Sequence, residues 1–172
     1  MEENPEELNN HVQVLMDAEH WNEAITLLQS HHSVVENHAE LSWNLGWAYF
    51  KAGDWNTAQQ QLSQAVRLAP TKAASWWALG VAQHEGGKLH EAERNLKEAL
   101  CLRDSSIFRQ VLALVLMERG KFAEAEQVHL KGLELKPESP ERWEVYAIFL
   151  EDVGRRAEAD AAYKKVRLFT GS

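Results

Sequence analysis

Cysteine is almost absent from this sequence: Cys101 is the only one in 172 residues. A disulfide within the chain is therefore excluded. Long apolar runs are missing too, since no stretch approaches the roughly 18 consecutive apolar residues of a membrane-spanning helix. The first residues, MEENPEEL, are acidic and polar, the opposite of a secretory signal peptide. These absences predict a cytoplasmic protein with no membrane insertion, unless a leader has been removed.

Basic residues are lacking in the first 38 positions, which hold eight of the 26 acidic residues. The other 134 residues carry 18 acidic and 18 basic side chains, so the net charge of −8 arises at the N-terminal end. No basic stripe is available to neutralise phosphates, which argues against nucleic acid as a partner. The acidic end has two interpretations that stay open: a solvated cap, or a surface that attracts a basic partner.

Motifs for catalysis or metal binding are also missing. There is no Gly-rich phosphate loop, no HExxH and no paired-cysteine spacing. Of the eight histidines, His31, His32 and His38 fall together, but in one expected loop without a spaced partner ligand. We expect His129 to be a packed core histidine and Cys101 a structural thiol. The sequence therefore predicts a protein that is not an enzyme and holds no cofactor or metal.

What the sequence does contain is pairs of amphipathic helices. Residues 41–52 carry apolar side chains at three- and four-residue spacings, as a helix with one buried face requires. Gly53 is expected to end this helix in the left-handed conformation and Asp54 to cap the next one. Pro70 ends the second helix. Gly46 is a small residue that suits a close approach of the two helices.

The same pattern returns with a period near 34 residues. Gly53, Gly87, Gly120 and Gly154 are separated by 34, 33 and 34 positions. An alanine follows each glycine by five positions: Ala58, Ala92, Ala125 and Ala159. One period upstream the frame continues through Ala24, with Glu19 where glycine would stand. Such a period is typical of stacked helical repeats.

The period and the motifs resemble the tetratricopeptide repeat (TPR), whose signature is W-x2-L-G-x2-Y, then A-x3-F, then P. One repeat carries Leu45-Gly46-x2-Tyr49, Ala58-x3-Leu62 and Pro70; the next carries Trp76-x2-Leu79-Gly80 and Ala92-x3-Leu96; the last carries Trp143-x2-Tyr146-Ala147 and Ala159-x3-Tyr163. Where the signature has a proline, the third repeat has Asp104, which we expect to cap the following helix, with Ser105 and Ser106 as rival caps.

The resemblance implies an all-α fold, a right-handed α-solenoid of about five helix-turn-helix repeats. The expected repeats are 5–38, 39–72, 73–105, 106–139 and 140–172, and they would form one solenoid over residues 1–172.

In TPR proteins the first helices of successive repeats line a concave groove. The resemblance places aromatic and apolar residues in the middle of this groove and acidic residues at its ends. Trp43, Trp47, Phe50, Trp77, Val81, Leu114 and Met117 are the expected anchors for a bound peptide, with His84 beside them, and Glu144, Glu151 and Asp152 would contact basic flanks. An alternative stays open, in which the aromatic rings bury one another and fill the groove.

Some members of the family clamp the C-terminal carboxylates of chaperones with Lys, Arg and Asn. The matching places here hold Asn9, Gln13, Asn44, Ala74 and Ala78, so both basic positions are lost. The resemblance therefore implies an adaptor or chaperone that holds an apolar or amphipathic segment of a partner protein, with basic flanks if any. The second hypothesis is a structural assembly module that acts through its ends or convex face, including self-association around Tyr163 and Phe169.

Overall fold

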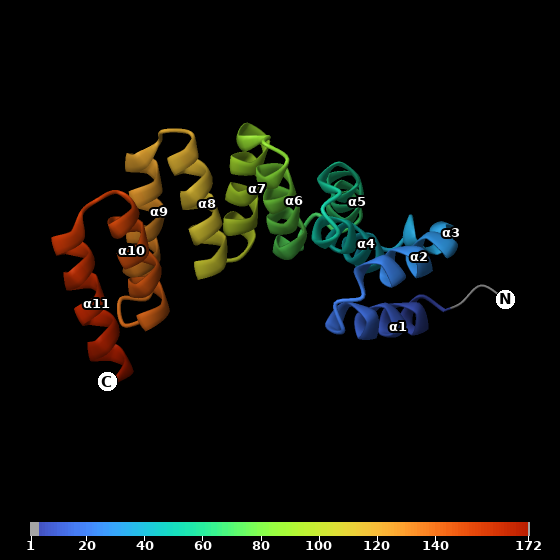
Figure 1. Cartoon of the computed structure of the whole chain (residues 1–172), viewed down its shortest axis with the longest axis horizontal. Coiled ribbons are helices and arrows are strands. Elements are labelled where there is room, and N and C mark those ends of the chain that lie inside the picture. Colours follow the sequence, from blue (N-terminus) through green and yellow to red (C-terminus); the bar gives the residue numbers. More distant parts are fainter. Residues whose placement is uncertain (1–3, 172) are drawn as a thin grey trace. The chain divides into compact units, whose positions relative to one another are not determined.

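The computed structural model of the protein describes residues 4–171, and all the regular secondary structure in that range is helical (Figure 1). Glu2 and Glu3 of the acidic N-terminal segment lie outside the described residues. The helices are α1 (Pro5–Asp17), α2 (Trp21–Ser30), α3 (His32–Val35), α4 (Ala39–Lys51), α5 (Trp55–Leu68), α6 (Ala73–Glu85), α7 (Leu89–Leu102), α8 (Ser106–Glu118), α9 (Phe122–Leu135), α10 (Pro140–Asp152) and α11 (Arg156–Thr170).

The chain forms two compact units, residues 1–102 and 103–172, here named unit 1 and unit 2. Unit 1 contains the helix pairs α1/α2, α4/α5 and α6/α7, and unit 2 contains α8/α9 and α10/α11. Within each unit the second helix of a pair packs on the first helix of the next, as α5 does on α6 and α9 on α10. The predicted all-α fold of stacked helix-turn-helix repeats is thereby confirmed.

The turns inside the pairs explain the period of the sequence. Gly53 has φ +85° and takes the left-handed conformation that ends α4. Its N–H donates to the Phe50 carbonyl, and the next N–H, that of Asp54, donates to the Tyr49 carbonyl. The Asp54 carboxylate then caps α5 by accepting from the Thr57 N–H, at 3.0 Å. Both predictions for this turn are confirmed.

Close approach of the paired helices in unit 1 depends on glycine. A Cβ atom built on Gly46 would lie 2.6 Å from Leu62 Cγ, and one on Gly80 would lie 2.7 Å from Leu96 Cγ. Leu62 and Leu96 are themselves fully buried. The expected close contact at Gly46 is therefore confirmed, and Gly80 repeats it one period later.

One local prediction is wrong. Residues 31–38 were expected to form a loop, but residues 32–35 form the short helix α3. The reason is Val35, which is 2% exposed and fills the core where a longer α2 would have packed. The break is stabilised at His31, whose Nδ1 lies 3.0 Å from the Leu27 carbonyl oxygen. The same carbonyl accepts from the Ser30 hydroxyl at 2.7 Å, so side chains replace its helical partner.

Candidate functional site

The residues predicted to bind a peptide fall into two groups, one in each unit. Unit 1 holds six of them on the first helices of two repeats: Trp43, Trp47 and Phe50 on α4, and Trp77, Val81 and His84 on α6. Unit 2 holds the other five, Leu114 and Met117 on α8 and Glu144, Glu151 and Asp152 on α10.

In unit 1 the aromatic residues form one aromatic stack, composed of Trp43, Trp47, Phe50 and Trp77. Trp47 is at its centre: its ring centroid lies 5.6 Å from that of Trp43, 4.9 Å from Phe50 and 5.5 Å from Trp77. The first two pairs are stacked and the third is tilted, and such ring contacts add favourable energy beyond burial. All four side chains are half-buried. The rings therefore cover one another in part, and each still contributes to the surface.

The ammonium group of Lys51 lies against this aromatic stack. The Lys51 ammonium is 5.7 Å from the centroid of the Trp47 ring and 5.7 Å from that of Trp21 on α2. At these distances a cation is attracted to an indole face. His84 and Val81 continue along α6 as half-buried side chains. His84 Nδ1 lies 3.5 Å from Glu85 Oε1. The aromatic surface of unit 1 is thus partly covered by contacts with residues of the same unit, among them Lys51.

In unit 2 three of the five predicted residues line a hollow of about 100 Å³, here named the α8/α10 pocket. Leu114 and Met117 line it from α8, and Ile148 and Asp152 line it from α10. Leu114 is 44% exposed and Ile148 is 38% exposed. Glu144 and Glu151 are exposed on α10 but do not line the pocket. Glu151 accepts a hydrogen bond from the Tyr163 hydroxyl at 3.1 Å.

His129 of α9 closes the bottom of this pocket. It is 5% exposed and packs against Phe149, with the ring centroids 5.1 Å apart. Burial, together with the nearby Arg109 guanidinium, lowers the pKa of His129 to about 4. The imidazole is therefore neutral at neutral pH. The prediction of a packed core histidine is confirmed, and it gives the pocket an uncharged floor.

Behind the pocket is a charged cluster that the sequence did not predict. Asp104 was expected to cap α8, but Ser105 occupies the N-cap position without a side-chain cap bond. The Asp104 carboxylate instead accepts from Nε and Nη2 of Arg109, at 2.8 and 2.6 Å, and from Nη2 of Arg142, at 2.5 Å. The one signal in the sequence was Arg109 itself, a charged residue on an apolar helix face between Phe108 and Leu112.

The cluster joins three helices of unit 2. Arg109 on α8 also donates to the Val128 carbonyl at 2.8 Å, and Arg142 on α10 donates to the Gly132 carbonyl at 2.7 Å, both on α9. Burial alone would raise the pKa of Asp104, but the hydrogen bonds from Arg142 and Arg109 hold it below its ordinary value. The carboxylate therefore stays ionised and fixes the helices that form the α8/α10 pocket.

Cys101 is exposed near the end of α7 and is not part of the core. Over residues 4–171, no group of three or more His, Cys, Asp or Glu side chains is placed to hold a metal ion. None of the helices in that same range has both the length and the apolar character needed to cross a bilayer.

The comparisons with known proteins agree with this architecture. Residues 43–106 match the family model of the tetratricopeptide repeat, whereas no curated protein sequence matches. A crystal structure of MamA has a TM-score of 0.76 at 23% identity and covers 93% of this chain and 94% of that one. MamA from residue 41 to its end, from Desulfovibrio magneticus RS-1, has a TM-score of 0.76 at 16% identity, with coverages of 96% and 94%.

Identities this low show a shared fold. The family match over residues 43–106 covers α4 to α7, and the same helix pairs and glycine turns continue outside it, in α8 to α11. Stacked repeats of this kind present extended surfaces with which they bind other proteins. Residues 43–106 therefore match the tetratricopeptide repeat, and the helix pairs outside that range share its fold, which supports a role in protein–protein interaction.

Proposed function

We propose that the protein is a non-enzymatic adaptor or chaperone that holds an apolar or amphipathic segment of a partner protein, and that the α8/α10 pocket is its main contact. The observation that carries this proposal is the exposure of Leu114 and Ile148 on either side of one hollow. Burying a large aliphatic side chain is worth about 1.5–3 kcal/mol. Clustered exposed apolar residues are typical of binding surfaces.

Charge around the pocket supports a basic or neutral partner. Four exposed acidic residues lie on α10, at Glu141, Glu144, Glu151 and Asp152. They attract Lys or Arg side chains that flank an apolar segment and repel acidic ones. A segment that places leucines on one face and lysines at its ends satisfies both the pocket and its rim, as an amphipathic helix in a groove does.

Recognition of a C-terminal carboxylate is disfavoured by unit 1. Asn44 donates its side-chain N–H to Asn9 Oδ1 at 2.8 Å, and Gln13 donates to Asp17 Oδ1 at 2.9 Å. At these positions some tetratricopeptide-repeat proteins bind the carboxylate of a ligand. Here Asn9 and Asn44 bond each other, and Gln13 bonds Asp17. The aromatic stack of unit 1 is proposed as a second anchor, through the parts of Trp43 and Trp77 that remain at the surface.

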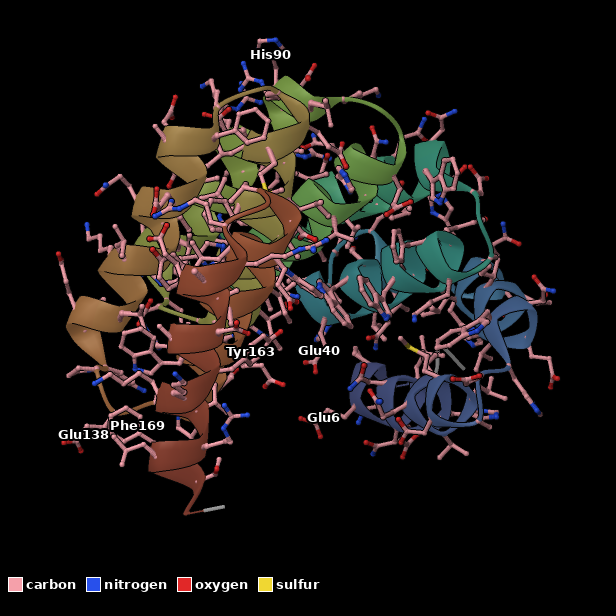
Figure 2. All side chains as sticks on the ribbon, turned by 60° about the vertical axis from the view of Figure 1, so that its left-hand side comes forward. Glu6, Glu40, His90, Glu138, Tyr163 and Phe169 are labelled. Carbon is pink, nitrogen blue, oxygen red and sulfur yellow. The ribbon has the colours of Figure 1, made fainter. Side chains whose placement is uncertain are left out.

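Self-association through the last helix is the second candidate. Leu168 on α11 is 66% exposed. Tyr163 and Phe169, both half-buried, lie on the same helix (Figure 2). A monomer by light scattering at high protein concentration would contradict this candidate and leave the first one unaffected.

A peptide titration tests the first candidate. The probe is a fluorescein-labelled amphipathic peptide with leucines at helical spacing and lysines at both ends, and fluorescence anisotropy gives its Kd. We expect Leu114→Ser to weaken binding about tenfold, since about 1.4 kcal/mol of apolar contact is lost. Leu135→Ser is the matched control, because Leu135 is 56% exposed on α9 and does not line the pocket. Equal Kd values for the two variants would contradict the proposal.

A further inference from the structure

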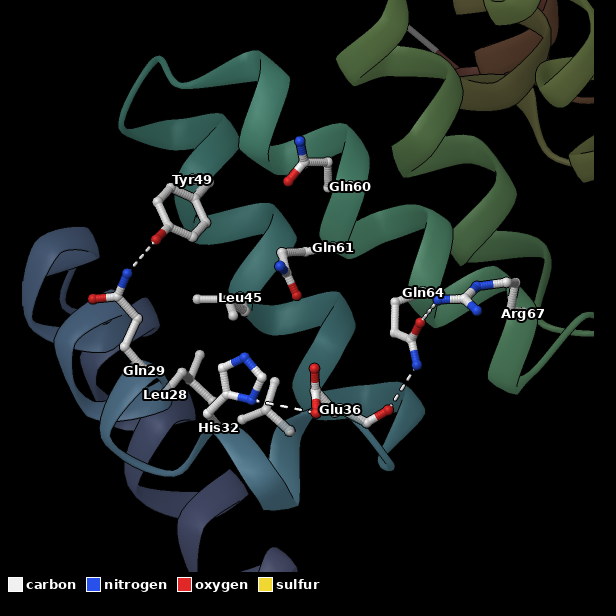
Figure 3. A pocket seen from close by; sticks show the side chains of 11 residues that line it. Leu28, Gln29, His32, Glu36, Leu45, Tyr49, Gln60, Gln61, Gln64 and Arg67 are labelled. Carbon is white, nitrogen blue, oxygen red and sulfur yellow. Dashed lines mark hydrogen bonds and ion pairs between the residues drawn. The ribbon is translucent and has the colours of Figure 1, made fainter.

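Unit 1 contains a larger pocket that none of the predicted binding residues lines. It has a volume of about 400 Å³ and lies between α2, α3, α4 and α5 (Figure 3). Volumes of this size are typical of ligand sites. Leu45 and Tyr49 line it from α4. They lie about 200° around this helix from Trp43 and Trp47, since each helical residue turns by about 100°. The pocket is therefore on the side of α4 opposite the aromatic stack.

The pocket exists because α2 is short. α2 has 10 residues and α5 has 14. One period of 34 residues relates His31 and His32 to Ala65 and Val66, which are buried in α5. Imidazoles replace these apolar side chains at the point where α2 ends at Ser30 and the chain turns into α3. The last helical turn that would lie beside α5 is displaced, and a space remains between α2 and α5.

Glutamine is the most frequent residue type in the wall, with Gln29, Gln60, Gln61 and Gln64, so this space is named the carboxamide pocket. Two of them are fixed: Gln29 donates to the Tyr49 hydroxyl at 2.5 Å, and Gln64 donates to the Glu36 carbonyl at 2.7 Å and accepts from Arg67. The side chains of the other two, Gln60 and Gln61, make no hydrogen bond to any residue between 4 and 171.

The chemistry of the wall selects an uncharged ligand with many hydrogen-bonding groups. A carboxamide offers both donors and an acceptor, as a peptide group does. Gln60 and Gln64 are four residues apart on α5, about 6 Å along the helix axis. An extended chain presents main-chain groups on the same edge about every 6.7 Å. The pocket holds one Arg and one Glu, so it has no strong net charge.

From this arrangement we infer that the carboxamide pocket is a second docking site, which holds an extended, uncharged segment of a partner protein. The carboxamides of Gln60 and Gln61 would donate to its main-chain carbonyls and accept from its main-chain N–H groups, and the second amide N–H of Gln64 would donate to a further carbonyl. This site is independent of the α8/α10 pocket and of the function proposed for it.

The test uses the peptide acetyl-Thr-Val-Thr-Val-Thr-amide and the NMR signals of the glutamine side-chain amides in the full-length protein. We expect saturable shifts at Gln60 and Gln61. The same peptide N-methylated at both valines keeps its side chains but loses two main-chain donors, and we expect its Kd to be roughly tenfold weaker. The double variant Gln60→Ala/Gln61→Ala should weaken binding of the parent peptide by a similar factor.

Gln127→Ala is the matched control, since Gln127 is the exposed residue of α9 that corresponds to Gln60. It should leave the Kd unchanged, as should Leu114→Ser. Equal binding of the parent and N-methylated peptides would overturn the inference. It would also be overturned if maltohexaose shifted the same amide signals and the peptide did not, because the site would then bind carbohydrate. Thermal melts of each variant confirm that a lost signal does not reflect unfolding.

Discussion

The two units carry the same helix-turn-helix pattern, but their cores are held together differently. In unit 1 the paired helices touch through Gly46 and Leu62, and again through Gly80 and Leu96. In unit 2 the residue that corresponds to Leu62 is His129, and two buried arginines share one carboxylate behind it. Unit 1 therefore depends on apolar contact at short range, whereas unit 2 depends on a charge and a neutral imidazole.

The surfaces of the two units also differ. Unit 1 stacks its aromatic rings on one another and leaves them half-buried, whereas unit 2 leaves aliphatic side chains exposed around a hollow. One repeat pattern can thus support a surface whose side chains cover one another and a surface whose side chains stay exposed. The following predictions test it, starting with the largest expected effect. Amide hydrogen exchange reads each unit separately and suits a chain with two compact units.

Asp104→Asn is expected to have the largest effect. It removes the carboxylate from two guanidinium groups that belong to residues only 7% and 6% exposed, Arg109 and Arg142. Leaving buried charges without their partner costs about 3–5 kcal/mol. Hydrogen exchange in α8 to α10 should accelerate accordingly, while α4 to α6 remain protected. Asp54→Asn is the control in unit 1, because asparagine also caps a helix. Similar losses in both variants would refute the special role of the cluster.

Acid should destabilise unit 2 through His129. Its pKa is about 4 in the folded protein, against an ordinary value of 6.5. The unfolded chain therefore binds a proton as the pH falls from 6.5 to 4 and the folded chain does not, so stability falls across this window by up to about 3 kcal/mol. Below pH 4 both states are protonated and the loss stops.

Denaturant unfolding at a series of pH values measures this loss. His129→Leu, which introduces the residue found at the corresponding place in unit 1, should flatten the dependence between pH 6.5 and 4. His11→Gln, at an exposed histidine of α1, should leave it as in the original protein. An unchanged slope in His129→Leu would show that other groups cause the acid sensitivity.

The smallest predicted effect concerns the first turn of unit 1. Glu19 has φ +58° where the other repeats have glycine. A residue with a Cβ atom loses about 1–2 kcal/mol in this conformation. Glu19→Gly should therefore stabilise α1 and α2 by about 1 kcal/mol, and Gly120→Glu should destabilise unit 2 by a similar amount. A lower melting temperature for Glu19→Gly would contradict the assigned strain.

The sequence allowed the fold to be predicted because the turns are local. A left-handed glycine such as Gly53, followed by a cap such as Asp54, acts within a few residues, and its recurrence makes the repeats visible. Asp104 was misassigned because its partner Arg142 is 38 residues away. The carboxamide pocket was missed for a related reason: it results from where α2 ends, and the loop expected around His31 and His32 gave no indication of α3.

The candidate site was predictable in composition and less so in arrangement. The spacing of Trp43 and Trp47 placed both on one helix face, but whether the rings would cover one another depended on Trp77, from another helix. Leu114, Met117 and Asp152 were named from the repeat frame and do line one pocket. Ile148 also lines that pocket and is not among the predicted anchors.

The most direct test of the proposed function is to observe which side chains the partner segment contacts. The measurement is methyl NMR of the protein during titration with the amphipathic, lysine-flanked peptide. We predict that the methyl signals of Leu114, Met117 and Ile148 shift together and saturate with the Kd found by anisotropy. Saturating binding with these three signals unmoved, or with shifts confined to Leu168 on α11, would contradict the account.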